Sequence, residues 1–568
     1  MRRFRRILFV LALIALAMWW FLPNPGPRIQ PGSALALELS GEYVEAAEPP
    51  LLARLLGDGR HSFIALLSEL RKAERDERLA VVVLRIRDLE IGWAKAQELR
   101  AAIQALRSSG RRVIAYLETS KLGANVEYYV AVAADEVRTA PSTRSPMIGL
   151  AAEYVFLGGL WEKLGVGVEV ERVGEYKGAA ETLAERKMSE PNREMANSLL
   201  DSIDGQFVAG IAEGRRLEPA AVRRAIDEAP ISPEQLKQLG LIDQIQFWDE
   251  LADELGGKDK LVDAADYARV DPKMVGFLPT TRFALIYGSG NVVVGRGTAS
   301  RSGSPIFASD TLTEALAEAS QDDAIQAIIL RIDSPGGSPL AADQIWRAAR
   351  QARAQGKPLI VSCSDLAASA AYYVAAGADA IVAQPGSLTG SIGVFVLRPV
   401  LRGLLEKLDI GVESLTRGSY ASLLLASEPL TERTRGWLHA EVASIYDLFL
   451  SRVAEGRDLS IEQVDAVARG RVWTGEQAAG NGLVDEIGGL RVAVRRALQQ
   501  LKLNPDSDVA LVPYPAPVSL AEQLDETLHN LTAGADPLGQ LLRRAEPWLE
   551  AIEAGAPALL PPFIPIIR

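Results

Sequence analysis

The chain has 568 residues, 48% apolar and 24% charged, which indicates a globular protein of several domains and excludes a disordered or polytopic membrane protein. The net charge of −12, reached despite four arginines among the first six residues, argues against nucleic acid as the main partner. A single cysteine, Cys363, excludes an intramolecular disulfide, and the three histidines lack metal-ligand spacing, so we expect neither a metal nor a cofactor.

The amino-terminal segment combines a basic start with an apolar run. Sixteen uninterrupted apolar residues, from Ile7 to Leu22, follow the arginines. As a helix this run rises about 24 Å, slightly less than a bilayer core of about 30 Å, and a tryptophan pair near its end suits the interface. A cleaved signal peptide is the alternative, but bulky residues stand where cleavage requires small ones. We therefore predict a cytoplasmic basic end and a transmembrane anchor over residues 1–24, with the chain beyond it outside the cytoplasm.

The body of the chain contains one strand–helix–strand pattern twice. Nearly continuous apolar runs rich in β-branched residues indicate strands buried on both faces, and each is followed by an amphipathic helix and a second apolar run. Such alternation is typical of parallel βαβ units. The predicted strand, helix and strand cover 80–86, 94–108 and 112–116 in the first copy, and 327–332, 340–355 and 358–362 in the second.

Matching residues recur at a nearly constant offset. Tyr128-Tyr129-Val130 matches Tyr372-Tyr373-Val374 at 244 positions, and Gly240-Leu-Ile-Asp243 matches Gly482-Leu-Val-Asp485 at 242. We infer a tandem repeat of two α/β domains of common ancestry. The predicted domains are 30–270 and 281–514, joined by a proline-containing junction and followed by a carboxy-terminal tail over 515–568.

Two polar features occur only in the second copy. Its first strand ends in Asp333-Ser-Pro-Gly-Gly337, whereas the first copy has no glycine pair there. Adjacent glycines allow a turn whose backbone N–H groups point outward, as an oxyanion hole requires, although a plain tight turn has the same sequence. Ser369 stands at the start of a small-residue helix where the first copy has Asn125. A serine at that place is either a nucleophile whose developing negative charge the helix dipole stabilises, or merely the cap of the helix.

A lysine is the feature that only the first copy retains. Lys177 corresponds to Ala421 in the second copy. A lone lysine is normally a solvated charge, but here one copy keeps the glycine pair and the serine while the other keeps the lysine. Such complementary loss is expected if a single site is built across both copies. A desolvated lysine has a lowered pKa and can serve as a general base without any histidine.

In the order and spacing of these motifs the chain resembles the long, two-domain form of bacterial signal peptide peptidase A, which is related in fold to Clp protease and crotonases. The motifs that carry the resemblance are Asp333–Ser338, Ala367–Tyr373, Leu388–Gly393 and Gly174–Lys177. The resemblance implies a tandem repeat of two Clp protease/crotonase-like domains behind a transmembrane helix. It covers roughly residues 1 to 515.

The resemblance also assigns roles in a serine endopeptidase with a Ser–Lys dyad. It implies that Ser369 is the nucleophile and Lys177 the general base. It implies that the backbone N–H groups of Gly337 and Ala370 bind the oxyanion, and that Ser391 orients the lysine. The family usually has two glycines after the nucleophile, whereas this chain has two alanines, whose methyl groups narrow the floor of the site.

Membership would further imply a single-pass protein of the bacterial inner membrane with its catalytic domain on the periplasmic side. Four subunits would form a bowl that degrades cleaved signal peptides and similar apolar peptides. A crotonase-type acyl-CoA enzyme would share the fold and the oxyanion hole, but an extracytoplasmic chain would meet no coenzyme A. A non-catalytic membrane-anchored scaffold is the second alternative, given the altered residues after the serine.

Overall fold

The computed structural model describes residues 29–45, 61–298 and 305–516. Across these three stretches, no helix has the length and apolar character needed to cross a bilayer. The predicted anchor over residues 1–24 lies outside the described residues, as does almost all of the predicted tail over 515–568.

The first half forms a parallel sheet in the order β2-β1-β3-β4-β5-β7, with β8 added beside β1. The buried strands are apolar on both faces because helices cover the sheet, which explains their continuous hydrophobic runs. The elements of this half are β1 Ser33–Val44, β2 His61–Ser62, α3 Phe63–Arg75, β3 Leu79–Glu90, α4 Trp93–Ser108, β4 Arg112–Leu117, α5 Asn125–Ala131, β5 Glu136–Thr139, α6 Gly158–Leu164, β6 Gly167–Val173, α7 Ala179–Ala184, α8 Glu190–Arg215, α9 Pro219–Glu228, α10 Pro233–Gln238, β7 Gln244–Ile245, α11 Trp248–Glu254, β8 Leu261–Asp263 and α12 Ala264–Ala268.

The second half repeats this plan. Its main sheet contains β9, β12, β13 and β14 as parallel neighbours, with β19 beside β9 as β8 lies beside β1. The elements of this half are β9 Thr281–Ser289, β10 Asn291–Val293, β11 Ile306–Ala308, α13 Ser309–Gln321, β12 Ala327–Ser334, α14 Pro339–Ala354, β13 Leu359–Ala368, α15 Ala370–Ala375, β14 Ala380–Ala383, β15 Leu388–Gly390, β16 Val394–Val400, α16 Arg402–Lys407, α17 Glu432–Arg457, α18 Ile461–Val467, β17 Val472–Thr474, α19 Gly475–Gly480, β18 Glu486–Ile487, α20 Leu490–Gln500 and β19 Val509–Tyr514.

The same buried contacts recur in both halves at the offset read from the sequence. The hydroxyl of Tyr128 donates to the carbonyl of Leu241 at 2.7 Å, and that of Tyr372 donates to the carbonyl of Leu483 at 2.9 Å. The predicted strands and helices of both copies coincide with β3, α4, β4, β12, α14 and β13. Two strands continue past their predicted ends: β3 reaches Glu90 because its end pairs with β1, and β13 reaches Ala368 because its end pairs with β15.

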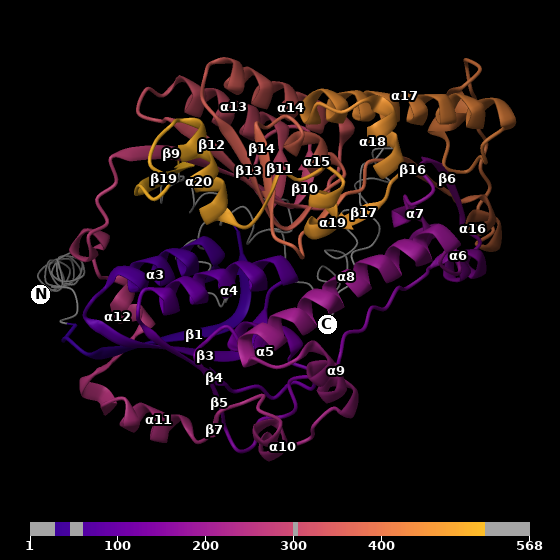
Figure 1. Cartoon of the computed structure of the whole chain (residues 1–568). Coiled ribbons are helices and arrows are strands. Elements are labelled where there is room, and N and C mark those ends of the chain that lie inside the picture. Colours follow the sequence, from indigo (N-terminus) through magenta and orange to yellow (C-terminus); the bar gives the residue numbers. More distant parts are fainter. Residues whose placement is uncertain (1–28, 46–60, 299–304, 517–568) are drawn as a thin grey trace, which may run out of the picture.

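The two halves are joined by shared structure as well as by the connecting chain. Strand β6 of the first half pairs antiparallel with β16 of the second, from Val173 opposite Val394 to Gly167 opposite Val400. The long helix α8 begins beside β17, where Met195 and Leu199 pack on Val472, and runs back into the core of the first half. Figure 1 shows both connections, with β6 beside β16 and α8 running between the orange half and the indigo and magenta half. Because β6 pairs with β16, residues 174–178, which follow β6, lie against the second half.

Candidate active site

Ser369 occupies a sharp turn between β13 and α15. Its backbone lies at φ 59° and ψ −119°, a region that residues other than glycine rarely adopt. The turn is held because the Ser369 N–H donates to the carbonyl of Gly390 at 2.8 Å, and the Ser369 carbonyl accepts from Tyr373 N–H at 2.9 Å. Strained backbone of this kind is found mainly at functional sites, where the surrounding structure holds it.

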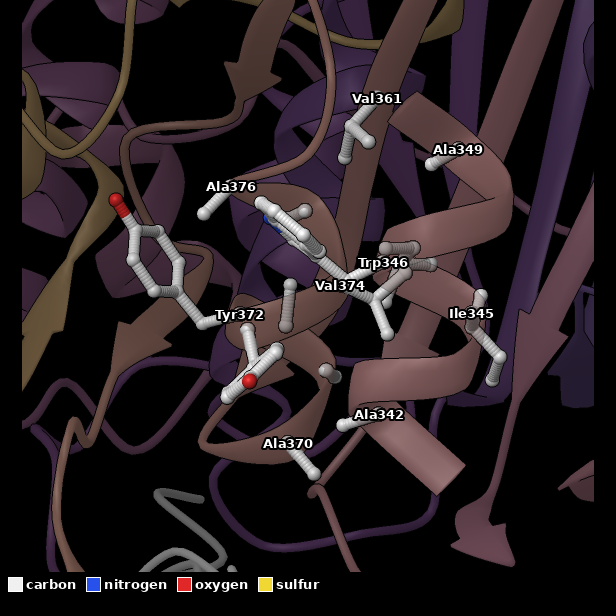
Figure 2. Packing of buried hydrophobic residues seen from close by; sticks show 14 of the residues in the cluster. Ala342, Ile345, Trp346, Ala349, Val361, Ala370, Tyr372, Val374 and Ala376 are labelled. Carbon is white, nitrogen blue, oxygen red and sulfur yellow. The ribbon is translucent and has the colours of Figure 1, made fainter. Parts of the chain in front are cut away.

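Helix α15 packs against α14, and this contact holds the turn at Ser369. The two residues after Ser369, Ala370 and Ala371, are small and fully buried at 0% exposure, and they belong to the same core as Ile345 and Trp346 of α14. Figure 2 shows these two helices side by side, with Val374 next to Trp346. Because both alanines are fully buried in this core, a larger side chain at Ala370 or Ala371 would have to displace its neighbours.

Lys177 lies within hydrogen-bonding distance of two serines of the other half. Its Nζ is 2.8 Å from Ser369 Oγ, 2.9 Å from Ser391 Oγ and 2.8 Å from the Ser391 carbonyl oxygen. All three side chains are fully buried, at 0% exposure. The residues that the two copies retained separately are therefore brought together at one point.

Burial lowers the pKa of the Lys177 ammonium well below its ordinary value, because desolvation disfavours the charged form. No carboxylate in the described part of the chain forms an ion pair with it that would counteract this effect. A neutral amine that faces a hydroxyl at 2.8 Å can accept its proton. The two acceptors on Ser391 hold the amine in place for that transfer.

The lowered pKa of Lys177 predicts a pH-dependent stability difference. In the unfolded chain the lysine titrates at about 10.4, so between its folded and unfolded pKa values only the unfolded state binds the proton, and stability rises with pH. Relative to Lys177→Met, the wild type should therefore gain up to about 1.4 kcal/mol in free energy of unfolding for each pH unit in that window. Denaturant unfolding from neutral to alkaline pH measures this slope, and Lys187→Met controls for the loss of one exposed lysine. A difference that stays constant with pH would contradict the neutral lysine.

A turn at residues 469–471 holds both the lysine and Ser391. The carbonyl of Arg469 accepts from Tyr176 N–H at 3.0 Å, and the carbonyl of Arg471 accepts from Ser391 N–H at 2.7 Å. Between them, Gly470 has φ +81°, and a Cβ built on it would lie 2.5 Å from the Lys177 backbone nitrogen. The turn therefore touches the lysine backbone so closely that only glycine fits.

No sequence motif marks this turn. The repeat comparison contained a signal for it, because the offset of 242 places Glu228 opposite Gly470. Gly470 thus belongs, like Ser369, to the residues that only the second copy has.

The predicted oxyanion donors lie at the ends of neighbouring strands. Val292 forms a parallel bridge with Gly337, in which Val292 N–H donates to the Gly336 carbonyl and Ser338 N–H donates to the Val292 carbonyl, both at 2.8 Å. In such a bridge the N–H of the central residue points to the opposite side, so that of Gly337 is directed away from Val292. Ala370 is the first residue of α15, where a backbone N–H has no acceptor within the helix.

The corresponding positions of the first half form a different contact. Asn125 begins α5, donates from Nδ2 to the Gly149 carbonyl at 3.0 Å and accepts at Oδ1 from Ile148 N–H at 3.3 Å. The Asn125 amide thus connects the start of α5 directly to residues 148–149. In the second half, Lys177 connects the corresponding segments at Ser369 and Ser391. In the second half, Ala421, which corresponds in sequence to Lys177, lies in a short 3-10 helix over Ala421–Leu424. The first half accordingly has no serine to act as a nucleophile at this turn.

Comparison with known proteins places both halves in one family. The model of peptidase family S49 matches twice, over residues 105–262 and 351–504. The chain is 34% identical over 522 residues to the "Serine protease SPPA, chloroplastic" of Arabidopsis thaliana, covering 90% of this chain and 76% of that protein. It is 28% identical to "Protease 4" of Haemophilus influenzae, covering 88% and 84%. A "Putative signal peptide peptidase SppA" of Enterococcus faecium is 31% identical over 34% of this chain and 56% of its own length.

These matches decide between the alternatives left open by the sequence. A crotonase-type acyl-CoA enzyme and a non-catalytic scaffold are both set aside, because the family is one of peptidases and the relatives that match most of this chain are named as proteases. The observed mixed α/β architecture, repeated twice, corresponds to the two family matches. The chain therefore belongs to peptidase family S49 and is a serine peptidase.

Proposed function

We propose that Ser369 and Lys177 form the catalytic dyad of this peptidase, with Ser369 as the nucleophile and Lys177 as the general base. The observation that carries the proposal is the 2.8 Å hydrogen bond between Lys177 Nζ and Ser369 Oγ in a fully buried site. Ser391 orients the amine through its hydroxyl and its carbonyl. A nucleophile paired with a base that a third group orients is the arrangement expected for activated serines.

In the acylation step, neutral Lys177 accepts the proton of the Ser369 hydroxyl as Oγ attacks the scissile carbonyl carbon. The carbonyl oxygen becomes an oxyanion, which the N–H groups of Gly337 and Ala370 stabilise. When the tetrahedral intermediate collapses, the C–N bond breaks and the lysine ammonium returns its proton to the leaving amine. The amine half of the peptide leaves, and the other half remains as an ester on Ser369.

In the deacylation step, a water molecule takes the place of the amine. Lys177 removes one proton from the water as its oxygen attacks the ester carbon, and a second oxyanion forms at the same two N–H groups. Collapse breaks the ester bond, and the ammonium returns the proton to Ser369 Oγ. The cycle leaves the enzyme unchanged and consumes one water for each peptide bond.

We further propose that the substrates are cleaved signal peptides and similar apolar peptides. The name of the Enterococcus faecium relative, a signal peptide peptidase, supports this substrate class. The basic, apolar amino-terminal sequence supports a single-pass protein of the bacterial inner membrane with a periplasmic catalytic domain, where such remnants occur. The Clp protease/crotonase-like form of the two domains and a homotetramer are the corresponding expectations for architecture and assembly.

A serine-directed fluorophosphonate probe tests the nucleophile in the full-length chain. It should label the wild type and not Ser369→Ala, while Ser451→Ala, which alters an exposed serine of the same half, should be labelled normally. Because the base must be neutral, the labelling rate should rise with pH through the lowered pKa of Lys177. Labelling that persists in Ser369→Ala would overturn the assignment.

The same probe, in a membrane-impermeant form, tests the location and the substrate. The peptidase should be labelled in spheroplasts and not in inside-out vesicles. In mild detergent, the labelled peptidase should have the mass of four subunits. Unlabelled enzyme should degrade a synthetic signal peptide, and labelled enzyme should not. Labelling of inside-out vesicles alone would place the site on the cytoplasmic side instead.

A further inference from the structure

A buried network of charges lies between the halves, next to the proposed catalytic site. Lys95 of α4 in the first half is 5% exposed, and its Nζ lies 2.6 Å from Asp333 Oδ2, 3.0 Å from Asp365 Oδ2 and 3.7 Å from Glu45 Oε1. Arg331 is fully buried beside it and forms two hydrogen bonds of 2.9 Å with Glu45. The proposed mechanism uses none of these groups.

The two aspartates lie on the strands that carry the proposed oxyanion donor and nucleophile. Asp333 is near the end of β12, four residues before Gly337, and Asp365 is near the end of β13, four residues before Ser369. Their positions mean that a single side chain from the first half contacts both strands just before they enter the site. Lys95 is therefore placed where it can set the spacing of those strand ends.

A bulge separates the two strands at this point. Ile332 pairs with Cys363, but the next pair is Ser334 with Ala367, so β13 has additional residues opposite Asp333. The Asp333 side chain bridges the bulge, because its Oδ1 accepts from Leu366 N–H at 3.2 Å. In the first half the pairing of β3 with β4 ends at the matching pair, Ile86 with Leu117, so no bulge follows it. Bulges next to active sites redirect a strand end, and here the redirected end leads to Ser369.

Asp365 in turn completes the helix that carries Lys95. Helix α4 begins after Gly92, which has no side chain to cap it. The Asp365 carboxylate of the other half accepts from Gly92 N–H at 3.2 Å and from Lys95 N–H at 3.0 Å, as an N-cap residue would. The matching helix α14 uses its own Ser338 for this purpose. The first half thus lacks a capping side chain of its own at the start of α4 and uses Asp365, from the bulge of the second half, in its place.

The charges explain why the lysine is required. The pKa of Asp333 is raised to about 6, chiefly by burial, with Lys95 opposing the rise and the neighbouring Asp365 carboxylate adding to it. Without the lysine, two partly buried carboxylates would face each other with no cation between them, since Arg331 is engaged by Glu45 and Glu98. Protonation or separation of these carboxylates would follow, and either change loosens the bond that bridges the bulge.

We propose that Lys95 is a positioning residue of the peptidase, which sets the distance between the oxyanion donor at Gly337 and the nucleophile Ser369 by holding Asp333 and Asp365 together. The inference rests on the proposed roles of Gly337 and Ser369. It gives the first half a second contribution to the site besides the general base. Lys95 acts through the two strand ends and does not touch the substrate.

Kinetics per titrated active site test the proposal in the full-length chain. Lys95→Met should lower kcat about 10²-fold, as loss of an oxyanion donor does, with KM changed less than about threefold, because the strand ends matter mainly in the transition state. Counting sites by complete fluorophosphonate labelling removes any effect of unfolded protein. Adding Asp333→Asn to Lys95→Met should restore part of kcat, because the asparagine carries no charge that needs the lysine.

A second buried lysine provides the matched control. Lys72 is 6% exposed and donates to the Tyr267 carbonyl at 2.9 Å, so Lys72→Met should lower the melting temperature without lowering kcat per site. If Lys95→Met does not fold, Asp365→Asn replaces it and should lower kcat about tenfold by weakening the same pair. An unchanged kcat per site in the folded variant overturns the positioning role. Failure of the dyad itself is recognised separately, by fluorophosphonate labelling of Ser369→Ala.

Discussion

Ser369→Ala and Lys177→Met should each reduce peptide hydrolysis by about 10⁴-fold or more, and the double variant should be hardly slower than either single one. The hydroxyl and the amine act as one unit across a 2.8 Å hydrogen bond, so removing either leaves the other without its function. The measurement is kcat/KM for a fluorogenic peptide, with thermal unfolding to show that each variant is folded.

The control for this pair is Lys187→Met, which removes an exposed lysine ten residues after the proposed base and should hydrolyse the peptide at the wild-type rate. Two independent losses that multiply in the double variant would contradict a dyad. In that case Lys177 would contribute to substrate binding or to folding, and Ser369 would require another base.

Gly470→Ala should be the most damaging change outside the dyad, with a loss of about 10²-fold or more in kcat. The added methyl group would lie 2.5 to 2.7 Å from the backbone nitrogen, Cα and Cβ of Lys177, so the lysine segment must move away from the turn. A displacement of about 1 Å is enough for a loss of this size, because proton transfer depends on the distance between Nζ and Oγ. The measurement is kcat at saturating peptide.

Gly482→Ala separates this contact from the backbone cost of replacing such a glycine. Gly482 has φ +84°, close to the +81° of Gly470, but the atom nearest to a Cβ there is Leu459 Cδ1 at 3.8 Å. Both variants should lose about 1 kcal/mol or more of stability, and only Gly470→Ala should lose activity. Equal activity in the two variants would show that the turn does not hold the lysine.

The sequence by itself determined the secondary structure of the core and the repeat. The sequence places strands such as 80–86 and 327–332 correctly. Burial on both faces requires a continuous apolar run, which can be recognised from consecutive residues alone. The choice of Ser369 and Lys177 as candidates also came from the sequence, since the two copies could be compared position by position. The end of β13 was predicted too early, because the residues up to Ala368 are strand only through pairing with β15.

Only the tertiary structure decided how the two halves share the site. The bond between Lys177 and Ser369 spans 192 positions of the chain and that between Lys95 and Asp333 spans 238, and no local pattern specifies either. Gly470 and Asp365 have ordinary sequence surroundings, and their importance arises from what β6, β16 and α4 bring against them. Periodicity encodes which face of an element is buried, whereas the distance between two side chains on different halves depends on how the folded sheets pack.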